Sequence, residues 1–184
     1  MEIEVKARVT DLQVLKSKLT EQGCVFTEPV VQDDTGYVRT TGSMERFLGN
    51  DVFLRIRVQS DGRVIFTAKQ PSRFAGDGLA KTEYEVTVSS ADELENILKL
   101  SGFQKAVHVR KTRQTAHHGG YEICLDEIEG LGSFIELEVM GDEADADSIQ
   151  KGMFSFLESL GISGVDQVKK GYDILMLEKE YGIQ

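Results

Sequence analysis

Charged residues recur at every second position in five segments of the chain. They are Glu2, Glu4 and Lys6; Arg55 and Arg57; Lys81, Glu83 and Glu85; Lys111 and Arg113; and Glu136 and Glu138. In an extended strand alternate side chains point to the same face, so each set shares one face and bulky apolar residues occupy the other. Carboxylates suit hard divalent cations, whereas guanidinium and ammonium groups bind polyanions. The pattern therefore indicates metal-assisted binding of a polyanion.

Two arrangements of these strands explain the alternation equally well. In the first, the charged faces point to solvent on a sandwich. In the second, the strands close into a barrel with a polar lumen, and their apolar faces pack outward against helices. Periodicity shows only that one face is polar, so by itself it leaves both arrangements open.

Composition excludes several classes of protein. The chain has 184 residues, enough for one substantial core, and a formal net charge of −10 that argues against a nucleic-acid-binding surface. No apolar run approaches the roughly 20 residues that would span a membrane. The chain opens on a charged strand, so we expect no signal peptide. Cys24 and Cys124 are expected to be buried free thiols of a cytoplasmic protein.

Hydrophobic periodicity and capping residues predict one mixed arrangement of strands and helices. We expect strands at about 2–9, 24–39, 52–59, 64–69, 82–88, 103–115, 121–126 and 134–140. Helices are expected at about 12–22, from the Ser90 cap to Leu100, at about 145–160 and at about 173–181. Turns are expected at Ser60–Gly62, at His117–Gly120 and at Gly130–Gly132, and loops at 41–43 and 71–78, the latter with Gly76 and Gly78.

An internal repeat links the two halves of the chain. Glu2-Ile-Glu4-Val, a capped helix and Gly23 match Glu83-Tyr-Glu85-Val, a capped helix and Gly102. We expect one domain over 1–184 with repeat units at about 2–40 and 83–120, because neither half has an obvious core of its own. Two such units curling together would bring both Glu-x-Glu pairs into one interior, which favours the barrel.

The ordered set of charged residues resembles the CYTH family, the triphosphate tunnel metalloenzymes. The resemblance covers almost the whole chain and includes Gly130-Leu131-Gly132-x-Phe134 before the last acidic pair. Lys169-Lys170-Gly171-Tyr172 resembles the C-terminal segment of the family, with glycine where serine is common. The resemblance implies an α+β fold, in which an eight-stranded antiparallel β-barrel forms a tunnel and helices pack outside it.

The resemblance also implies roles for individual residues. The implied ligands of Mg²⁺ or Mn²⁺ are Glu136 and Glu138 first, then Glu2, Glu4 and Asp126. The implied substrate-binding residues are Lys6, Arg55, Arg57, Lys69, Lys81, Glu83, Glu85, Lys111, Arg113 and Lys169. Catalysis is expected to involve Glu2, Glu4, Lys6, Lys111 and Asp126.

The function that the resemblance implies is metal-dependent chemistry on a small-molecule triphosphate. Chain length, Asp34-x-x-Tyr37 and the Tyr172 segment resemble the class IV adenylyl cyclases, which convert ATP to cyclic AMP and pyrophosphate. The alternatives are an inorganic tripolyphosphatase or a thiamine triphosphatase, although the chain has no tryptophan to line a thiamine pocket. A non-catalytic binder of polyphosphate or nucleotide is a further alternative. A homodimer is compatible with the apolar spacing of 174–177.

Overall fold

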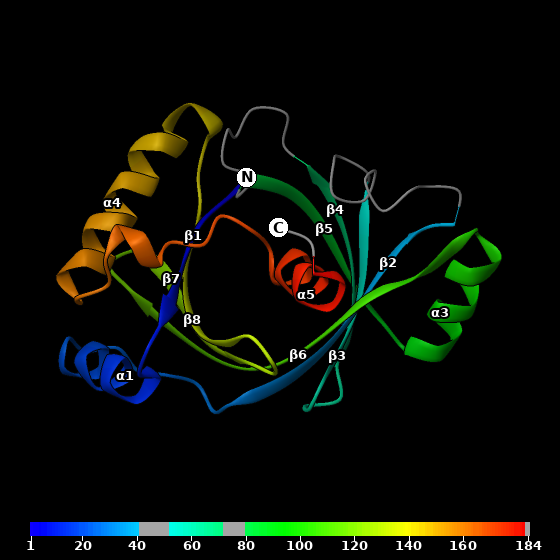
Figure 1. The fold of residues 1–184 in the computed structure, drawn as a ribbon, viewed down its shortest axis with the longest axis horizontal. Coiled ribbons are helices and arrows are strands. Elements are labelled where there is room, and N and C mark those ends of the chain that lie inside the picture. The colour runs from blue at the N-terminus through cyan, green and yellow to red at the C-terminus, as the bar shows by residue number, and fades with distance from the viewer. Residues whose placement is uncertain (41–51, 72–79, 183–184) are drawn as a thin grey trace.

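The computed structural model describes residues 1–40, 52–71 and 80–182, apart from a few side chains, among them that of Lys81. The described part holds eight strands (Figure 1). They are β1 (Glu2–Val9), β2 (Val30–Arg39), β3 (Phe53–Gln59), β4 (Val64–Pro71), β5 (Ala80–Val88), β6 (Phe103–His118), β7 (Tyr121–Ile128) and β8 (Gly132–Met140). The helices include α1 (Leu12–Glu21), α3 (Ala91–Leu100), α4 (Ala146–Ser159) and α5 (Tyr172–Tyr181).

The strands form a closed antiparallel barrel in the order β1-β5-β4-β3-β2-β6-β7-β8, which confirms the predicted fold. At the seam between β1 and β5, Glu2 pairs with Lys81 and Ile3 with Ala80 among the residues that the structure describes. Further along β1, Ala7 bridges to Gln167, and the Lys6 carbonyl accepts a hydrogen bond from the Val168 N–H at 2.8 Å. The C-terminal segment therefore lies against β1 at Lys6 and Ala7.

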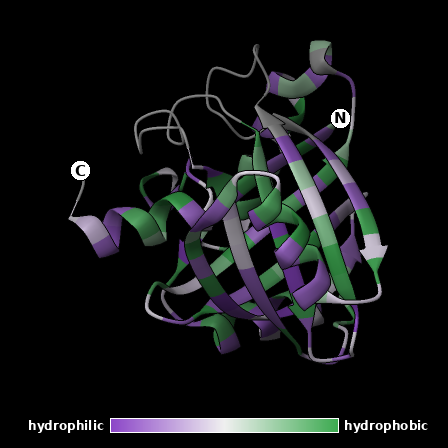
Figure 2. Cartoon of the chain, turned by 90° about the vertical axis from the view of Figure 1, so that its right-hand side faces the viewer, coloured by the Kyte–Doolittle hydropathy of each residue, from purple (hydrophilic) through white to green (hydrophobic). Residues whose placement is uncertain are grey.

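Apolar residues on the outer face of the barrel pack against three helices. Ile3, Val5 and Ala7 on β1 are buried, and the latter two join a cluster with residues of α1 and α4. A second cluster packs β2 and β3 against α3 through Tyr37, Leu54, Ile56 and Leu98. Figure 2 shows the resulting alternation of hydrophilic and hydrophobic residues along the strands. Charge on these strands is thereby directed inward, as the barrel interpretation requires.

The last helix, α5, packs against the inner side of the barrel and lies within the curve of the sheet (Figure 1). Tyr172 at its start meets Phe134 of β8 edge-to-face, with ring centroids 5.1 Å apart. Val107 and Val109 of β6 belong to the same cluster. The expectation that helices pack outside is therefore right for α1, α3 and α4, whereas α5 helps to close the lumen. No helix in the described ranges is both long and apolar enough to cross a membrane.

Three predicted boundaries were wrong. The second strand begins at Val30. The stretch from Cys24 to Pro29 is a connection, in which the Thr27 N–H donates a hydrogen bond to the Thr115 carbonyl at 2.8 Å. His117 and His118 belong to β6, and the turn is Gly119-Gly120, where φ values of 60° and 87° favour glycine. Pro71, expected at the start of a loop, is instead the last residue of β4. The loop prediction at 41–43 and the rest of the one at 71–78, including Gly76 and Gly78, lie outside the described residues.

The two units of the predicted repeat are neighbours in the barrel. Each is a strand, a helix and a strand, namely β1-α1-β2 and β5-α3-β6. β1 pairs with β5, and β2 pairs with β6 over ten residue positions. Each helix begins at a side-chain cap, Asp11 for α1 and Ser90 for α3. The matching strands of the two units thus lie side by side.

Candidate active site

The lumen contains a cavity of about 550 Å³ that is lined mainly by charged side chains. Acids outnumber bases by nine to six among the lining residues that the structure describes. The acids are Glu2, Glu4, Asp34, Glu83, Glu85, Glu122, Glu136, Glu138 and Asp173, and the bases are Lys6, Arg55, Arg57, Lys69, Lys111 and Arg113. With this excess of acid, the cavity holds polyanion-binding donors but needs additional positive charge before it can hold a polyanion.

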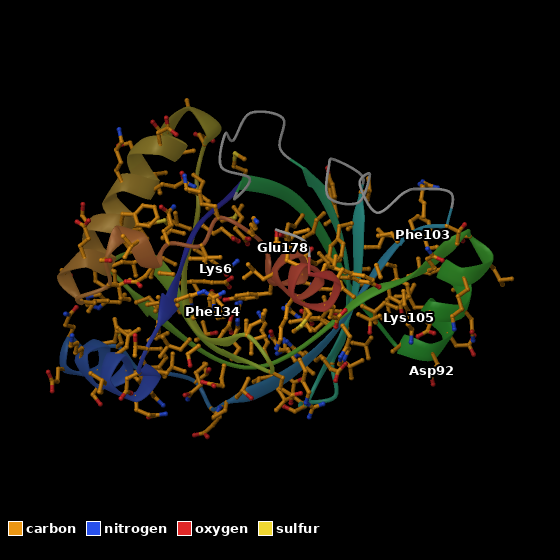
Figure 3. The ribbon with its side chains drawn as sticks, viewed as in Figure 1. Lys6, Asp92, Phe103, Lys105, Phe134 and Glu178 are labelled. Atoms are coloured by element: carbon orange, nitrogen blue, oxygen red, sulfur yellow. The ribbon has the colours of Figure 1, made fainter. Side chains whose placement is uncertain are left out.

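Two lysines converge on the aromatic ring of Tyr172. The ammonium nitrogen of Lys6 lies 4.2 Å from the ring centroid, and that of Lys111 lies 4.9 Å from it. Lys6 also pairs with Glu136 at 2.8 Å and with Glu4 at 3.4 Å. Burial lowers the pKa of Lys6, but these two carboxylates outweigh it and raise the pKa above its usual range. Figure 3 shows Lys6 and Phe134 pointing into the interior beside α5.

Lys111 differs from Lys6 in its electrostatic environment. Burial and the neighbouring guanidinium of Arg113 lower its pKa to about 8, against the attraction of Asp126. Its ammonium group lies 3.2 Å from a carboxylate oxygen of Asp126. Lys111 is thus a cation whose charge an incoming anion would stabilise.

Arg113 is the centre of a buried ion network. Its Nε and Nη2 donate to the two oxygens of Asp126 at 2.7 and 2.5 Å, and Nη2 also contacts Glu136. Its Nη1 lies 3.5 Å from Glu138. Burial raises the pKa of both Asp126 and Glu136, but the nearby cations outweigh burial and lower both pKa values. Both carboxylates are therefore already charge-compensated.

A second network lies on β2, β3, β4 and β5. Arg57 forms a bidentate pair with Asp34 through contacts of 2.7 and 2.8 Å. Arg55 reaches Glu85 at 3.1 Å and Asp34 at 3.8 Å. Its Nε is buried without a hydrogen-bond partner, so this guanidinium retains donor capacity that faces the cavity.

A row of carboxylates crosses β7, β8 and β1. Glu122 and Glu4 lie directly opposite Glu138 on its two sides, an arrangement in which like charges repel. Burial, together with Glu136, Glu2 and Glu4, raises the pKa of Glu138 to about 8 despite the proximity of Arg113. Burial and neighbouring carboxylates also raise the pKa of Glu2.

This row fits a divalent metal ion. Oxygen donors suit Mg²⁺ and Mn²⁺, and a cation would remove the repulsion that holds Glu138 protonated. One ligand atom each from Glu122, Cys124 and Glu138 lies within 4.8 Å of the others. Glu136 makes close contacts with both Lys6 and Arg113, whereas Glu4 and Glu138 each make one longer ion pair, of 3.4 and 3.5 Å. Glu2, Glu4 and Glu138 are therefore the better placed ligands.

The chain matches a known protein family over most of its length. The model of the CYTH domain matches residues 1–172. The chain belongs to the CYTH family. A relative in Methanocaldococcus jannaschii, named as a candidate adenylate cyclase, is 30% identical over 175 residues, which cover 94% of this chain and 96% of that protein. The adenylate cyclase CyaB of Aeromonas hydrophila is 23% identical over 95% of this chain and 87% of its own length.

Solved CYTH-like structures share the fold. The PH1819 protein of Pyrococcus horikoshii superposes with a TM-score of 0.83 at 25% identity, covering 97% of this chain and 99% of its own. HpAC1 from Hippeastrum, described as a candidate adenylyl cyclase with a dominant triphosphatase activity, has a TM-score of 0.69 at 18% identity and covers 98% of this chain and 96% of its own.

Most residues that the CYTH resemblance implied meet in the lumen. Asp126 is fully buried, pairs with Arg113 and Lys111, and does not itself line the cavity. Glu83 pairs with Lys69, and Glu85 with Arg55, so both orient cations. Lys169 is exposed and also lies outside the cavity lining, and the side chain of Lys81 lies outside the described part.

Sequence reasoning missed several lumen residues of this CYTH barrel. Glu122 and Cys124 precede Asp126 by four and two positions on β7, so strand alternation could have placed both on its face. Gln32 and Gly36 share a face with Asp34 in the same way. Both cysteines are buried and free, as predicted.

Proposed function

We propose that this CYTH protein is a divalent-metal-dependent enzyme that converts ATP bound in the barrel to cyclic AMP and pyrophosphate. One observation carries the proposal: a single cavity holds six basic side chains together with a larger set of carboxylates. The bases suit a chain of phosphates, and the surplus acids suit the metal ions that would offset its charge. The adenylate cyclase names of two relatives support the choice of reaction.

Triphosphate binding would exchange ion pairs within the protein for ion pairs with substrate. Arg57 and Arg113 each hold a carboxylate in forked geometry, which a phosphate group can reproduce. Lys6 and Lys111 both lie over the ring of Tyr172 as compact charges. Asp34 and Asp126 would keep the guanidinium groups oriented toward the lumen.

In the cyclisation, the ribose 3′-hydroxyl releases its proton to water, its oxygen forms a bond to the α-phosphorus, and the bond between the α-phosphorus and the bridging oxygen of pyrophosphate breaks. A bound Mg²⁺ or Mn²⁺ would supply Lewis-acid stabilisation of the phosphate charge. Glu2, Glu4 and Glu138 are the residues that would hold it. Lys6, Lys111 and Arg113 would stabilise the charge that develops on the departing pyrophosphate.

Hydrolysis of the terminal phosphate is the second candidate function. The same cavity would serve it, with water in place of the ribose hydroxyl as nucleophile. The neighbour HpAC1, whose description gives a dominant triphosphatase activity, favours keeping this candidate. The two reactions differ in which phosphorus the nucleophile meets, so product analysis separates them.

The test is incubation of the protein with ATP and Mn²⁺ or Mg²⁺, followed by chromatography of the nucleotides. Cyclic AMP with pyrophosphate is the expected result, whereas ADP with phosphate would assign the second candidate. A parallel reaction with inorganic tripolyphosphate tests whether the nucleoside is needed. Absence of metal-dependent turnover of either compound would refute the proposal. Glu138→Gln is the matched inactive control, because it removes a proposed metal ligand whose one ion pair, with Arg113, is long at 3.5 Å, while the Lys6–Glu136 pair remains.

A further inference from the structure

Gln32 carries an unpaired polar atom on the wall of the lumen. Its side chain extends from β2 into the cavity lining, and the residue is only 6% exposed. Its amide oxygen Oε1 is buried and has no hydrogen-bond partner. A buried acceptor without a donor destabilises the free protein, and a ligand that supplies the donor would remove this cost.

The cations nearest to Gln32 in the sheet are committed elsewhere. Lys111 is its cross-strand neighbour on β6, but the Lys111 ammonium group donates to Asp126 at 3.2 Å. Arg57, one lumen position along β3, is held by both oxygens of Asp34. A divalent ion is also disfavoured beside Gln32, because these two neighbours are positive.

Phosphate groups cannot satisfy this amide oxygen. Ionised phosphate oxygens only accept hydrogen bonds, so the guanidinium and ammonium groups suit them and an amide oxygen does not. A partner for Gln32 must carry an O–H or N–H group. In a nucleoside triphosphate these groups are the ribose hydroxyls and the exocyclic amine of the base, whereas inorganic tripolyphosphate has none to offer when it is fully ionised.

We propose that Gln32 is a specificity-determining residue that binds the nucleoside part of the substrate, so that the lumen selects a nucleoside triphosphate over inorganic tripolyphosphate. The amide oxygen accepts a hydrogen bond from a ribose hydroxyl or from the exocyclic amine. The nucleoside then lies next to Lys111 and one lumen position from Arg57, which places the α-phosphate beside these two cations. This inference rests on the proposed triphosphate function.

Gln59 provides a matched control. It lies directly opposite Gln32 on β3, is 7% exposed, and also has a buried amide oxygen without a partner. It does not belong to the cavity lining. Gln59→Met therefore reports the effect of removing a buried unpaired amide, and Gln32→Met adds the effect of removing the ligand contact. Neither variant should unfold more easily than the parent, because methionine fills a similar volume without a polar atom.

The experiment compares the parent protein, Gln32→Met and Gln59→Met in the presence of Mn²⁺. It measures kcat/KM for ATP and the inhibition constant of inorganic tripolyphosphate as a competing ligand. We expect Gln32→Met to lower kcat/KM for ATP by about tenfold, the effect of one lost hydrogen bond. The inhibition constant of tripolyphosphate should be unchanged, and Gln59→Met should change neither quantity.

Equal losses for ATP and tripolyphosphate in Gln32→Met, or no loss for ATP, would overturn the inference and leave the proposed function standing. A parent protein that neither consumes ATP nor binds tripolyphosphate would refute the proposed function and the inference with it. Two analogues identify the donor. With inosine triphosphate, which lacks the exocyclic amine, or with 2′-deoxy-ATP, the parent protein should show the tenfold loss for whichever group Gln32 binds.

Discussion

The buried pair of Asp34 and Arg57 offers a quantitative test of how the lumen is held together. Replacing Asp34 with asparagine keeps the shape of the side chain but removes its charge. The amide can still accept one hydrogen bond from Arg57, but its NH₂ group then faces the second guanidinium N–H. We therefore expect Asp34→Asn to lose the charge pair and one of the two hydrogen bonds.

The magnitude follows from the geometry of the pair. The contacts are 2.7 and 2.8 Å, and the side chains are 11% exposed for Asp34 and 10% for Arg57. Breaking a buried pair by removing one partner costs about 3–5 kcal/mol. Glu85 also attracts Arg57, so the expected loss lies near the lower limit, about 3 kcal/mol. For a chain of this size that loss lowers Tm by about 6–12 °C.

The assay is urea unfolding of the metal-free protein at neutral pH, with Asp33→Asn as the control. Asp33 is the next residue on β2 but points outward, where it pairs with His108 at 2.7 Å and Arg110 at 3.0 Å. All three side chains are at least 35% exposed, so we expect a loss below about 1 kcal/mol. The two variants differ in burial rather than in the chemistry of the substitution.

A loss below about 1 kcal/mol for Asp34→Asn, equal to that of the control, would refute the reasoning. It would mean that solvent or other carboxylates satisfy Arg57 as well as Asp34 does. The double variant with Arg57→Met provides a second check. Its loss should be smaller than the sum of the two single losses, because the second substitution removes a charge that is already uncompensated.

The remaining predictions concern the carboxylates and the lumen wall. Glu138 has a pKa raised from 4.5 to about 8 in the native protein, so stability of the metal-free protein should fall as pH rises through this window. Chemical unfolding should show a decrease on the order of 2 kcal/mol between about pH 6 and 8, and Glu138→Gln should reduce it; an unchanged slope would contradict the shift. Glu136→Gln should instead destabilise the protein, measured in the same way, because two buried cations lose their partner; equal stability of both variants would contradict this contrast. Gly36→Ala should cost about 1–3 kcal/mol in thermal or urea unfolding, since its Cβ would lie 2.6 Å from the Phe53 ring and 2.7 Å from Val107; unchanged stability would show that both side chains move freely.

Strand alternation was sufficient to predict which side chains share the polar face of each strand, because a period of two is a local property of extended backbone. The assignment of Glu4 and Glu138 to one barrel interior needed the internal repeat and the resemblance to the CYTH family as well. The capped helices α1 and α3 could be predicted for the same reason, since Asp11 and Ser90 act within their own first turn. The strand that was expected to begin at Cys24 shows what local sequence cannot predict, because the β-propensity of a segment does not reveal whether a partner strand lies beside it.

Which charges compensate one another depends on register and closure. The sequence alone showed that Glu136 and Glu138 share a face, but their different pKa shifts arise from neighbours on other strands. Lys6 and Arg113 lie against Glu136, whereas Glu4 and Glu122 flank Glu138. Coulomb interactions depend on separation and burial rather than on distance along the chain, so only the folded barrel distinguishes a paired carboxylate from one that is free to take a metal.

By itself, the sequence determined that acidic and basic side chains share one face of each strand. The tertiary structure decided that α5 enters the curve of the sheet, that Lys6 and Lys111 both lie over the ring of Tyr172, and that the amide oxygen of Gln32 is left unpaired on the wall. The physical reason is that alternation is a property of each strand, whereas burial and partner choice arise only when strands distant in sequence enclose the same volume.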